Sequence, residues 1–328
     1  MKYTITFWLS LIVLDFTTIK LRIIFRRCPQ DYRLNRNDVV IVTGCSAGIG
    51  IPVAQELIKR GGKVIWACRN TQAAQEALDS LSWQPSYGTK GYVLELDLAD
   101  KKSIEQFVTK FKQRESKLNV LMLNAGVNSS ERKLTKDGFE ETIGINHLGH
   151  MYLVYLLRNM LKTSATLDSP AKVVVVASDL HRLTSKPNFN DMMFERDFKL
   201  FKAYNHSKLL NILFARKLSQ LWKDANIRVH SVHPGTPVFT RLTRNFPILR
   251  YSFVRAILHA VSLIYTKSAY EGAQTLVFGA VAPICQSQTG LYFENCMIAT
   301  ESAAAQNDDY ANKVWEISCT LLDIDERW

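Results

Sequence analysis

Short runs of branched apolar residues alternate with longer amphipathic stretches along most of this 328-residue chain. Strands are predicted at residues 39–42, 63–68, 91–97, 118–124, 172–177 and 227–232, and helices at 50–60, 71–82, 101–115, 139–162, 202–222 and 268–281. Strands separated by helices form βαβ units, so the sheet they build is parallel and is covered by helices on both faces. We therefore expect one α/β domain over residues 38–328, a doubly wound parallel sheet, with no internal repeat or linker.

The N-terminal segment, residues 1–27, does not follow this pattern. Residues 3–19 are mostly apolar, and four basic residues come soon after them: Lys20, Arg22, Arg26 and Arg27. This apolar run is at the short end of the roughly 17–25 residues that span a bilayer. We interpret residues 1–27 as a membrane anchor with a basic flank; a cleaved signal peptide and a buried helix of the fold are the alternatives. The positive-inside rule would place the folded domain in the cytosol, and we expect an endoplasmic-reticulum or lipid-droplet membrane.

The formal net charge of +11 is concentrated in two segments. Residues 1–37 hold seven Lys/Arg against two Asp, and residues 235–270 hold five Lys/Arg and no acid. Large apolar side chains are interleaved with these charges, which suits an anionic membrane surface better than a nucleic acid. A solvated basic face without a partner is the alternative. The six cysteines show neither a C-x-x-C pair nor a zinc spacing, so we expect free thiols and no metal site.

A glycine-bearing loop follows the first apolar strand, with the sequence Thr43-Gly44-Cys45-Ser46-Ala47-Gly48-Ile49-Gly50. Glycines allow the backbone to approach a pyrophosphate closely, and the N-terminus of the following helix offers free N–H groups. The loop therefore predicts dinucleotide binding. A tight strand-to-helix turn without a ligand is the alternative interpretation.

Two further strand ends bear on the cofactor. The second strand is followed by Arg69 and by no acid. A guanidinium suits the 2′-phosphate of NADP(H), whereas a carboxylate would favour NAD, so we expect NADP(H). The third strand ends at Asp97, where a carboxylate can accept a hydrogen bond from adenine. The alternatives are an exposed, helix-capping Arg69 and an Asp97 that caps the helix beginning near Lys101.

Four polar residues are predicted to line the same crevice. Tyr204 and Lys208 are four residues apart and share one face of a helix. An ammonium beside a phenol lowers the phenol pKa from about 10, so Tyr204 fits a general acid/base. Ser178 follows the most apolar strand and can donate to the same substrate oxygen, and Asn146 lies within the long predicted helix. A packed aromatic residue beside a surface lysine would show the same Tyr-x-x-x-Lys spacing.

The order of these motifs resembles the short-chain dehydrogenase/reductase family over residues 38–300. The resemblance rests on Thr43-Gly44-x3-Gly48-x-Gly50, Asp97, Asn124-Ala125-Gly126, Asn146, Ser178, Tyr204-x-x-x-Lys208 and Pro234-Gly235. Within the family the chain is similar to the retinol dehydrogenase branch and to the oxidoreductase domain of the WW-domain-containing oxidoreductase. That similarity is seen in Trp66-Ala67-Cys68-Arg69, Asn146-His147-Leu148-Gly149-His150 and the KSAYEGAQ sequence at 267–274.

This resemblance implies a Rossmann-type fold and assigns roles. Tyr204 would exchange the proton, Lys208 would hold the nicotinamide ribose and tune Tyr204, and Ser178 would bind and polarise the substrate oxygen. Asn146 would support a water-mediated proton relay through Lys208. Cofactor contacts are implied for Thr43, Gly44, Ser46, Ala47, Gly48, Ile49, Gly50, Arg69, Asp97, Asn124, Ala125, Gly126, Tyr204, Lys208, Pro234 and Gly235. The chain departs from the family's motifs at Leu123, Ala177 and Phe239.

Two apolar segments are predicted to wall the substrate pocket. One lies between Ser178 and Tyr204 and contains Phe189, Met192, Met193, Phe194 and Phe198; the other is residues 236–267. Apolar walls imply a lipophilic substrate such as a retinoid, a steroid or a lipid aldehyde. Packing on the core or on a second subunit is the alternative, so a homodimer stays open. We expect an NADP(H)-dependent oxidoreductase that interconverts a lipophilic alcohol and its carbonyl, against the alternative of a catalytically quiet membrane-bound scaffold or regulator.

Overall fold

A computed structural model of the chain describes residues 26–36, 38–81, 91–235 and 267–328. These residues form one eight-stranded sheet in the order β3-β2-β1-β4-β5-β6-β7-β8. The strands are β1 (Val39–Thr43), β2 (Lys63–Cys68), β3 (Gly91–Glu95), β4 (Val120–Leu123), β5 (Ala171–Val176), β6 (Ile227–His233), β7 (Tyr292–Glu294) and β8 (Met297–Ala299). Neighbours from β3 to β7 are parallel, and β8 pairs antiparallel with β7. The predicted doubly wound α/β fold is confirmed.

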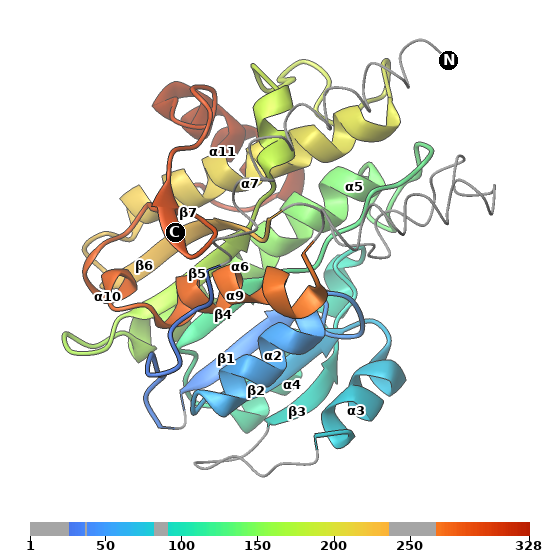
Figure 1. Cartoon of the computed structure of the whole chain (residues 1–328). Helices are drawn as coiled ribbons and strands as arrows, with labels where there is room; N and C mark the ends of the chain where they lie inside the picture. Colours follow the sequence, from blue (N-terminus) through green and yellow to red (C-terminus); the bar gives the residue numbers. More distant parts are fainter. Residues whose placement is uncertain (1–25, 37, 82–90, 236–266) are drawn as a thin grey trace, which may run out of the picture.

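Helices cover both faces of the sheet. One face packs against α2 (Gly50–Lys59), α3 (Thr71–Asp79), α9 (Ala269–Val281) and α10 (Ile284–Ser287). The other packs against α4 (Lys101–Arg114), α6 (Gly149–Ser164) and α7 (Leu200–Leu221), and α11 (Asp308–Leu322) packs on α7. In Figure 1, α2 and α9 lie in front of the sheet and α4 and α6 lie behind it. The 3-10 turn η3 (Asp179–Leu183) begins right after Ser178, two residues beyond the end of β5.

Strand β1 shows why these strands read as continuous apolar runs. Successive side chains of a strand point to opposite faces of the sheet. Val39 and Ile41 accordingly belong to the core beneath α4 and α6, and Val40 and Val42 belong to the core beneath α2 and α9. Because helices cover both faces, every residue of β1 is buried.

The helix predicted over 139–162 is present as a continuous helical stretch over residues 141–164, but it is not a regular α-helix throughout. The turn α5 (Glu141–Ile143) leads into the π-helical turn η2 (Gly144–Leu148), which continues into α6. The strands β7 and β8 and the helix α11 were also not predicted. A strand of three residues, such as β7 or β8, is too short to show a period of two in its sequence. Helix α11 packs on α7 (Figure 1).

Residues 26–36, called here the N-terminal strap, pack against α2 and α9. The backbone N–H of Cys28 donates to Gln274 Oε1 at 3.2 Å, and the buried Arg60 donates to the carbonyl oxygens of Pro29 and Tyr32 at 2.7 Å each. All six cysteines are free, as predicted, and they are buried. Among the residues that the structure describes, no helix is long and apolar enough to cross a bilayer; the apolar part of the predicted anchor lies outside them.

Candidate active site

The glycine loop turns sharply from β1 into α2. Gly44 and Gly48 have positive φ angles of 78° and 61°, which glycine adopts without strain. A Cβ on Gly50 would lie 2.2 Å from the carbonyl oxygen of Gly44, and one on Gly44 would lie 2.9 Å from the Cα of Ala125. The N-terminus of α2 has neither a side-chain cap nor an acid in its first turn. Its unsatisfied N–H groups fit a phosphate group, so the loop fits a dinucleotide.

Thr43 joins this loop to the end of β4. Its Oγ1 accepts hydrogen bonds from the backbone N–H groups of Asn124 at 2.9 Å and Ala125 at 3.0 Å. The side-chain amide of Asn124 in turn donates to the carbonyl oxygen of Thr43 at 2.7 Å. The strand order reverses between β1 and β4, and ligands of open α/β sheets bind in the crevice at such a point. The predicted Asn124-Ala125-Gly126 turn therefore stands at the centre of the crevice.

Arg69 and Asp97 stand at neighbouring strand ends. The backbone N–H of Leu96 donates to the carbonyl oxygen of Cys68 at 3.0 Å, which joins the two ends. Arg69 is exposed and is not a helix cap, because Asn70 caps α3 by accepting from Ala73 N–H. The alternative for the acid is also wrong, since Asp100 caps α4.

Ser46 of the glycine loop reaches the same edge. Its side chain acts to lower the pKa of the thiol of Cys68, which directly precedes Arg69. The carboxylate of Asp97 accepts from Ala99 N–H at 3.0 Å, so a local turn fixes its direction. A cationic side chain next to the phosphate-binding loop suits a ligand that carries a second phosphate there.

Tyr204, Ser178 and Lys208 meet at the carboxyl end of β5. The Ser178 side chain lies near the Tyr204 hydroxyl and acts to lower its pKa. The ammonium of Lys208 lies 5.4 Å from the centre of the Tyr204 ring and donates to the carbonyl oxygen of Val176 at 3.2 Å. Ser178 also accepts from Leu180 N–H at 3.3 Å, which fixes its side chain at the start of η3.

Burial shifts the pKa values of both Tyr204 and Lys208. It raises the pKa of Tyr204 to about 12, although the hydrogen bond from Ser178 acts in the opposite direction. It also lowers the pKa of the Lys208 ammonium to about 8. The lowered Tyr204 pKa that was expected is not seen in the protein alone, because desolvation of the phenolate outweighs the effect of Ser178. Tyr204 is thus protonated at neutral pH.

Asn146 lies in η2, and its side-chain amide forms hydrogen bonds with other residues of the protein. Its Oδ1 accepts from Val127 N–H at 2.8 Å, and its Nδ2 donates to the carbonyl oxygen of Val127 and the hydroxyl of Ser207, each at 2.9 Å. A Cβ on Gly126 would lie 3.3 Å from Asn146 Oδ1 and 3.5 Å from Lys208 Nζ. Asn146 therefore holds the loop after Gly126 against the helix that carries Lys208. No sequence motif had pointed to Val127 or Ser207.

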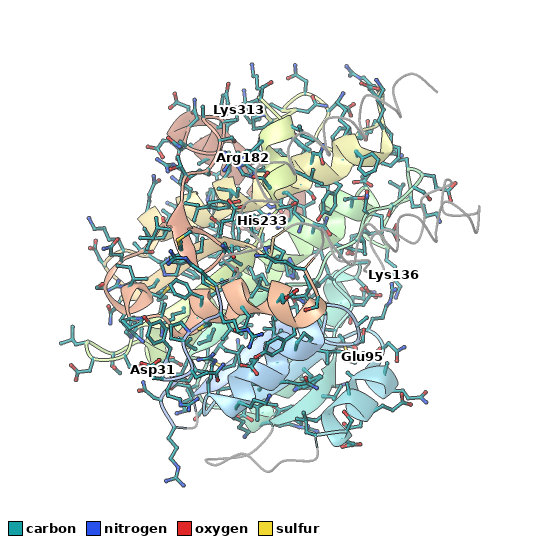
Figure 2. The ribbon with its side chains drawn as sticks, in the orientation of Figure 1. Asp31, Glu95, Lys136, Arg182, His233 and Lys313 are labelled. Atoms are coloured by element: carbon teal, nitrogen blue, oxygen red, sulfur yellow. The ribbon has the colours of Figure 1, made fainter. Side chains whose placement is uncertain are left out.

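Pro234 and Gly235 close the crevice on the side of α9. His233, the last residue of β6, lies near the middle of the molecule (Figure 2). Gly235 has φ +98°, and a Cβ there would lie 2.6 Å from the Cδ of Lys267. A Cβ on Gly272 of α9 would lie 3.2 Å from the Cδ1 of Ile49 and 3.7 Å from the Pro234 carbonyl oxygen. The turn after β6 thus lies close to the glycine loop.

The predicted pocket wall between Ser178 and Tyr204 is partly wrong. Met192 and Phe194 are buried in the core, where the Phe194 ring meets His206 edge-on at 5.3 Å. Phe189, Met193 and Phe198 are only partly buried against the same core. Residues 236–266 lie outside the described part of the chain.

Known proteins share both sequence and fold with this chain. The family model for short chain dehydrogenases matches residues 38–247. Retinol dehydrogenase 12 of Bos taurus is 36% identical over 301 residues, which cover 92% of this chain and 90% of the relative. The WW domain-containing oxidoreductase of Gallus gallus is 36% identical over 296 residues, covering 87% of this chain and 68% of the relative. RhlG of Pseudomonas aeruginosa, solved as an active-site complex with NADP, superposes with a TM-score of 0.63 at 21% identity, covering 84% of this chain and 98% of that one.

The family match and the curated relatives make the chain an oxidoreductase that acts on CH–OH groups, and the glycine turn fits a nicotinamide dinucleotide. The sequence matches assign it further. The chain belongs to the short-chain dehydrogenase family, in the retinol dehydrogenase-like branch.

Proposed function

We propose that the chain is an NADP(H)-dependent enzyme that interconverts a lipophilic alcohol and its carbonyl compound, with Tyr204 as general acid/base. One observation carries this proposal: Ser178, Tyr204 and Lys208 meet at the carboxyl end of β5, where Lys208 Nζ lies 5.4 Å from the centre of the Tyr204 ring and Ser178 acts on the Tyr204 hydroxyl. Two neighbouring hydroxyls can both reach a single substrate oxygen, which is what carbonyl reduction and alcohol oxidation require.

The protein's part in the reaction is to move one proton and to stabilise one oxygen. When bound, the reduced cofactor supplies a hydride to the carbonyl carbon, and the oxidised cofactor accepts one from the alcohol. Tyr204 donates its proton to the carbonyl oxygen in reduction and takes it back in oxidation. Ser178 donates a hydrogen bond to the same oxygen, and the Lys208 ammonium favours the phenolate that remains.

The substrate class draws support from the relatives. Four of them are named retinol dehydrogenases, which supports a retinoid, and we propose a retinoid, a steroid or a lipid aldehyde as the substrate class of this chain. Purified protein with NADPH is to be assayed against retinal, steroid ketones and lipid aldehydes. General acid/base catalysis contributes about 10²–10⁴-fold, so Tyr204→Phe should lower kcat by that factor. Tyr155→Phe on α6, whose ring packs on Trp328, is the matched control.

The alternative is a catalytically quiet protein that keeps the cofactor fold. NADPH binding without any turnover that depends on Tyr204, across the whole substrate panel, would favour that alternative and reject the proposed activity.

Arg69 supports the preference for NADP(H). Its charge is exposed beside the loop that would bind the dinucleotide, and it caps no helix. Arg69→Asp replaces a bidentate phosphate donor by a repelling carboxylate and should reverse the ratio of kcat/KM for NADPH over NADH. Arg33→Asp, an equal charge change at an exposed site of the N-terminal strap, is the control. An unchanged cofactor ratio in Arg69→Asp would contradict the assignment.

We also propose that the enzyme works at an endoplasmic-reticulum or lipid-droplet membrane and faces the cytosol. Support comes from the described residues that flank the two basic, apolar segments, 1–25 and 236–266. The thiol of Cys296 contacts the carbonyl oxygen of Arg26 at 3.4 Å, and the neighbouring Asn295 accepts from the Lys267 ammonium at 3.2 Å. Lys267 in turn lies against Gly235. The start of the strap and both ends of segment 236–266 are therefore adjacent.

This arrangement would place the crevice mouth next to a lipid surface, with no nucleic acid as partner. Deleting residues 1–25 should release the protein from the membrane fraction after cell fractionation. If the deletion variant stays in the membrane fraction, membrane binding would be assigned to segment 236–266 instead. A homodimer, tested by light scattering, is compatible with this proposal but is not needed for it.

A further inference from the structure

His150, the second residue of α6, bridges two parts of the site that are far apart in sequence. Its Nε2 lies 2.9 Å from the Oγ1 of Thr43 at the start of the glycine loop. Its Nδ1 lies 3.1 Å from the backbone carbonyl oxygen of Asn146 in the π-helical turn. The side chain is only 2% exposed, so water does not satisfy either nitrogen.

Thr43 fixes the direction of both hydrogen bonds. A hydroxyl has one proton and two lone pairs, and Thr43 Oγ1 already accepts from the N–H groups of Asn124 and Ala125. Its proton therefore points to His150 Nε2, since the other acceptor in reach, a carbonyl oxygen, is farther away at 3.4 Å. An unprotonated Nε2 leaves the proton on Nδ1, which donates to the Asn146 carbonyl. Burial lowers the pKa of His150 to about 3, so the ring is neutral, as this pattern needs.

The far end of this connection is the catalytic pair. Asn146 and Lys208 both border Gly126, where a Cβ would lie within 3.5 Å of a polar atom of each. The positive charge of Lys208 also acts on His150 and helps to keep it neutral. A continuous set of hydrogen bonds thus runs from the loop that would bind the cofactor to the π-helical turn beside Lys208.

We propose that neutral His150 is a positioning residue, which couples the cofactor loop at Thr43 to the Asn146 turn and so to the Tyr204–Lys208 pair. Its acceptor side keeps Thr43, and with it the end of β4, in place. Its donor side fixes the carbonyl of a turn whose π-helical geometry departs from regular helix. This inference rests on the proposed function, because the coupling matters only where Thr43 contacts a dinucleotide and Lys208 tunes Tyr204.

Three substitutions separate the two sides of the ring. An asparagine amide nitrogen takes the place of Nδ1, so His150→Asn keeps the donor to Asn146 and loses the acceptor for Thr43. A glutamine amide oxygen reaches the place of Nε2, so His150→Gln keeps the acceptor and loses the donor. His150→Phe removes both. The matched control is His147→Asn in the same turn, because the His147 ring bonds Ser318 of α11 at 2.9 Å rather than the site.

The measurements are the NADPH dissociation constant by fluorescence titration and the pH profile of kcat, both on the full chain. Losing one buried hydrogen-bond partner typically changes an equilibrium about tenfold. His150→Asn should weaken NADPH binding about tenfold with kcat nearly unchanged. His150→Gln should keep NADPH binding, lower kcat about tenfold and shift the pH profile. His147→Asn should change neither quantity.

Nitrogen-15 NMR of the imidazole ring gives a readout that needs no turnover. The expected state of His150 without cofactor is a neutral ring with its proton on Nδ1. A charged ring at pH 7, a proton on Nε2, or His150 variants that all match the wild type in NADPH binding and pH profile would overturn the proposal. If no substrate is turned over while Asn and Gln still differ in NADPH affinity, the proposed activity fails and the Thr43 side of the coupling stands.

Discussion

Lys208 is a buried ammonium, and we expect the chain to be more stable without it. The side chain is 3% exposed and donates to one carbonyl oxygen, that of Val176, at 3.2 Å. No carboxylate contributes to its pKa, which burial lowers from 10.5 to about 8. Lys208→Met keeps the length of the side chain and removes the charge. The carbonyl of Val176 keeps a partner, because Asn211 Nδ2 also donates to it at 3.1 Å.

The size and the pH range of this effect follow from the two pKa values. One pKa unit corresponds to 1.36 kcal/mol, so the fall from 10.5 to about 8 destabilises the folded state by about 3 kcal/mol where both states are protonated. The unfolded chain keeps this proton up to about pH 10.5 and the folded chain only up to about pH 8. The free energy of unfolding of the wild type therefore rises with pH between these values.

Urea unfolding of wild type and Lys208→Met between pH 6 and pH 11 tests this reasoning. The variant should be more stable by about 3 kcal/mol below pH 8 and equal to wild type above pH 10.5. Lys202→Met on the same helix is the control, because Lys202 is exposed and pairs with Asp197 at the surface. The reasoning is refuted if Lys208→Met is less stable than wild type at pH 7, or if the difference does not change with pH.

Three further substitutions follow from the geometry. Gly50→Ala places a Cβ 2.2 Å from the carbonyl oxygen of Gly44 and should weaken NADPH binding at least about tenfold, measured by fluorescence titration. Gly126→Ala places a Cβ 3.3 Å from Asn146 Oδ1, which is tighter than an ordinary contact, and should lower kcat about tenfold with a smaller effect on NADPH affinity, measured by steady-state kinetics; equal effects on both would contradict it. Arg60→Gln leaves three carbonyl oxygens of the N-terminal strap without their charged donor and should reduce the free energy of unfolding by about 3 kcal/mol in urea; a value within about 0.5 kcal/mol of wild type would contradict it.

The central sheet could be predicted from the sequence because burial on both faces leaves a clear trace. A strand covered by helices on each side must be apolar at every position, and β1 and β5 are buried throughout. The strands β7 and β8 leave no such trace, since each has three residues and β8 lies largely exposed at the edge. The π-helical turn around Asn146 was also hidden, because its residues are as buried as those of a regular core helix.

Some residues of the site could also be predicted from the sequence, and others could not. Arg69, Asp97 and Ser178 could be placed because they follow strands, and the carboxyl ends of parallel strands meet at one edge of a sheet. Tyr204 and Lys208 could be paired because a spacing of four residues puts them on one helical face. His150 could not be assigned, because its partner Thr43 is brought to it only by the fold.

A single cause, desolvation, shifts the pKa values of Tyr204 and Lys208 in opposite directions. It raises the pKa of Tyr204 to about 12 and lowers that of Lys208 to about 8, because in each case the charged form is the one that burial disfavours. The Lys208 ammonium lies 5.4 Å from the centre of the Tyr204 ring, so a phenolate at Tyr204 would be stabilised by that charge and would in turn hold the proton on Lys208. At neutral pH the protein alone holds both protons. In the proposed mechanism this resting state is the proton donor for carbonyl reduction, and oxidation requires the proton to leave Tyr204 first.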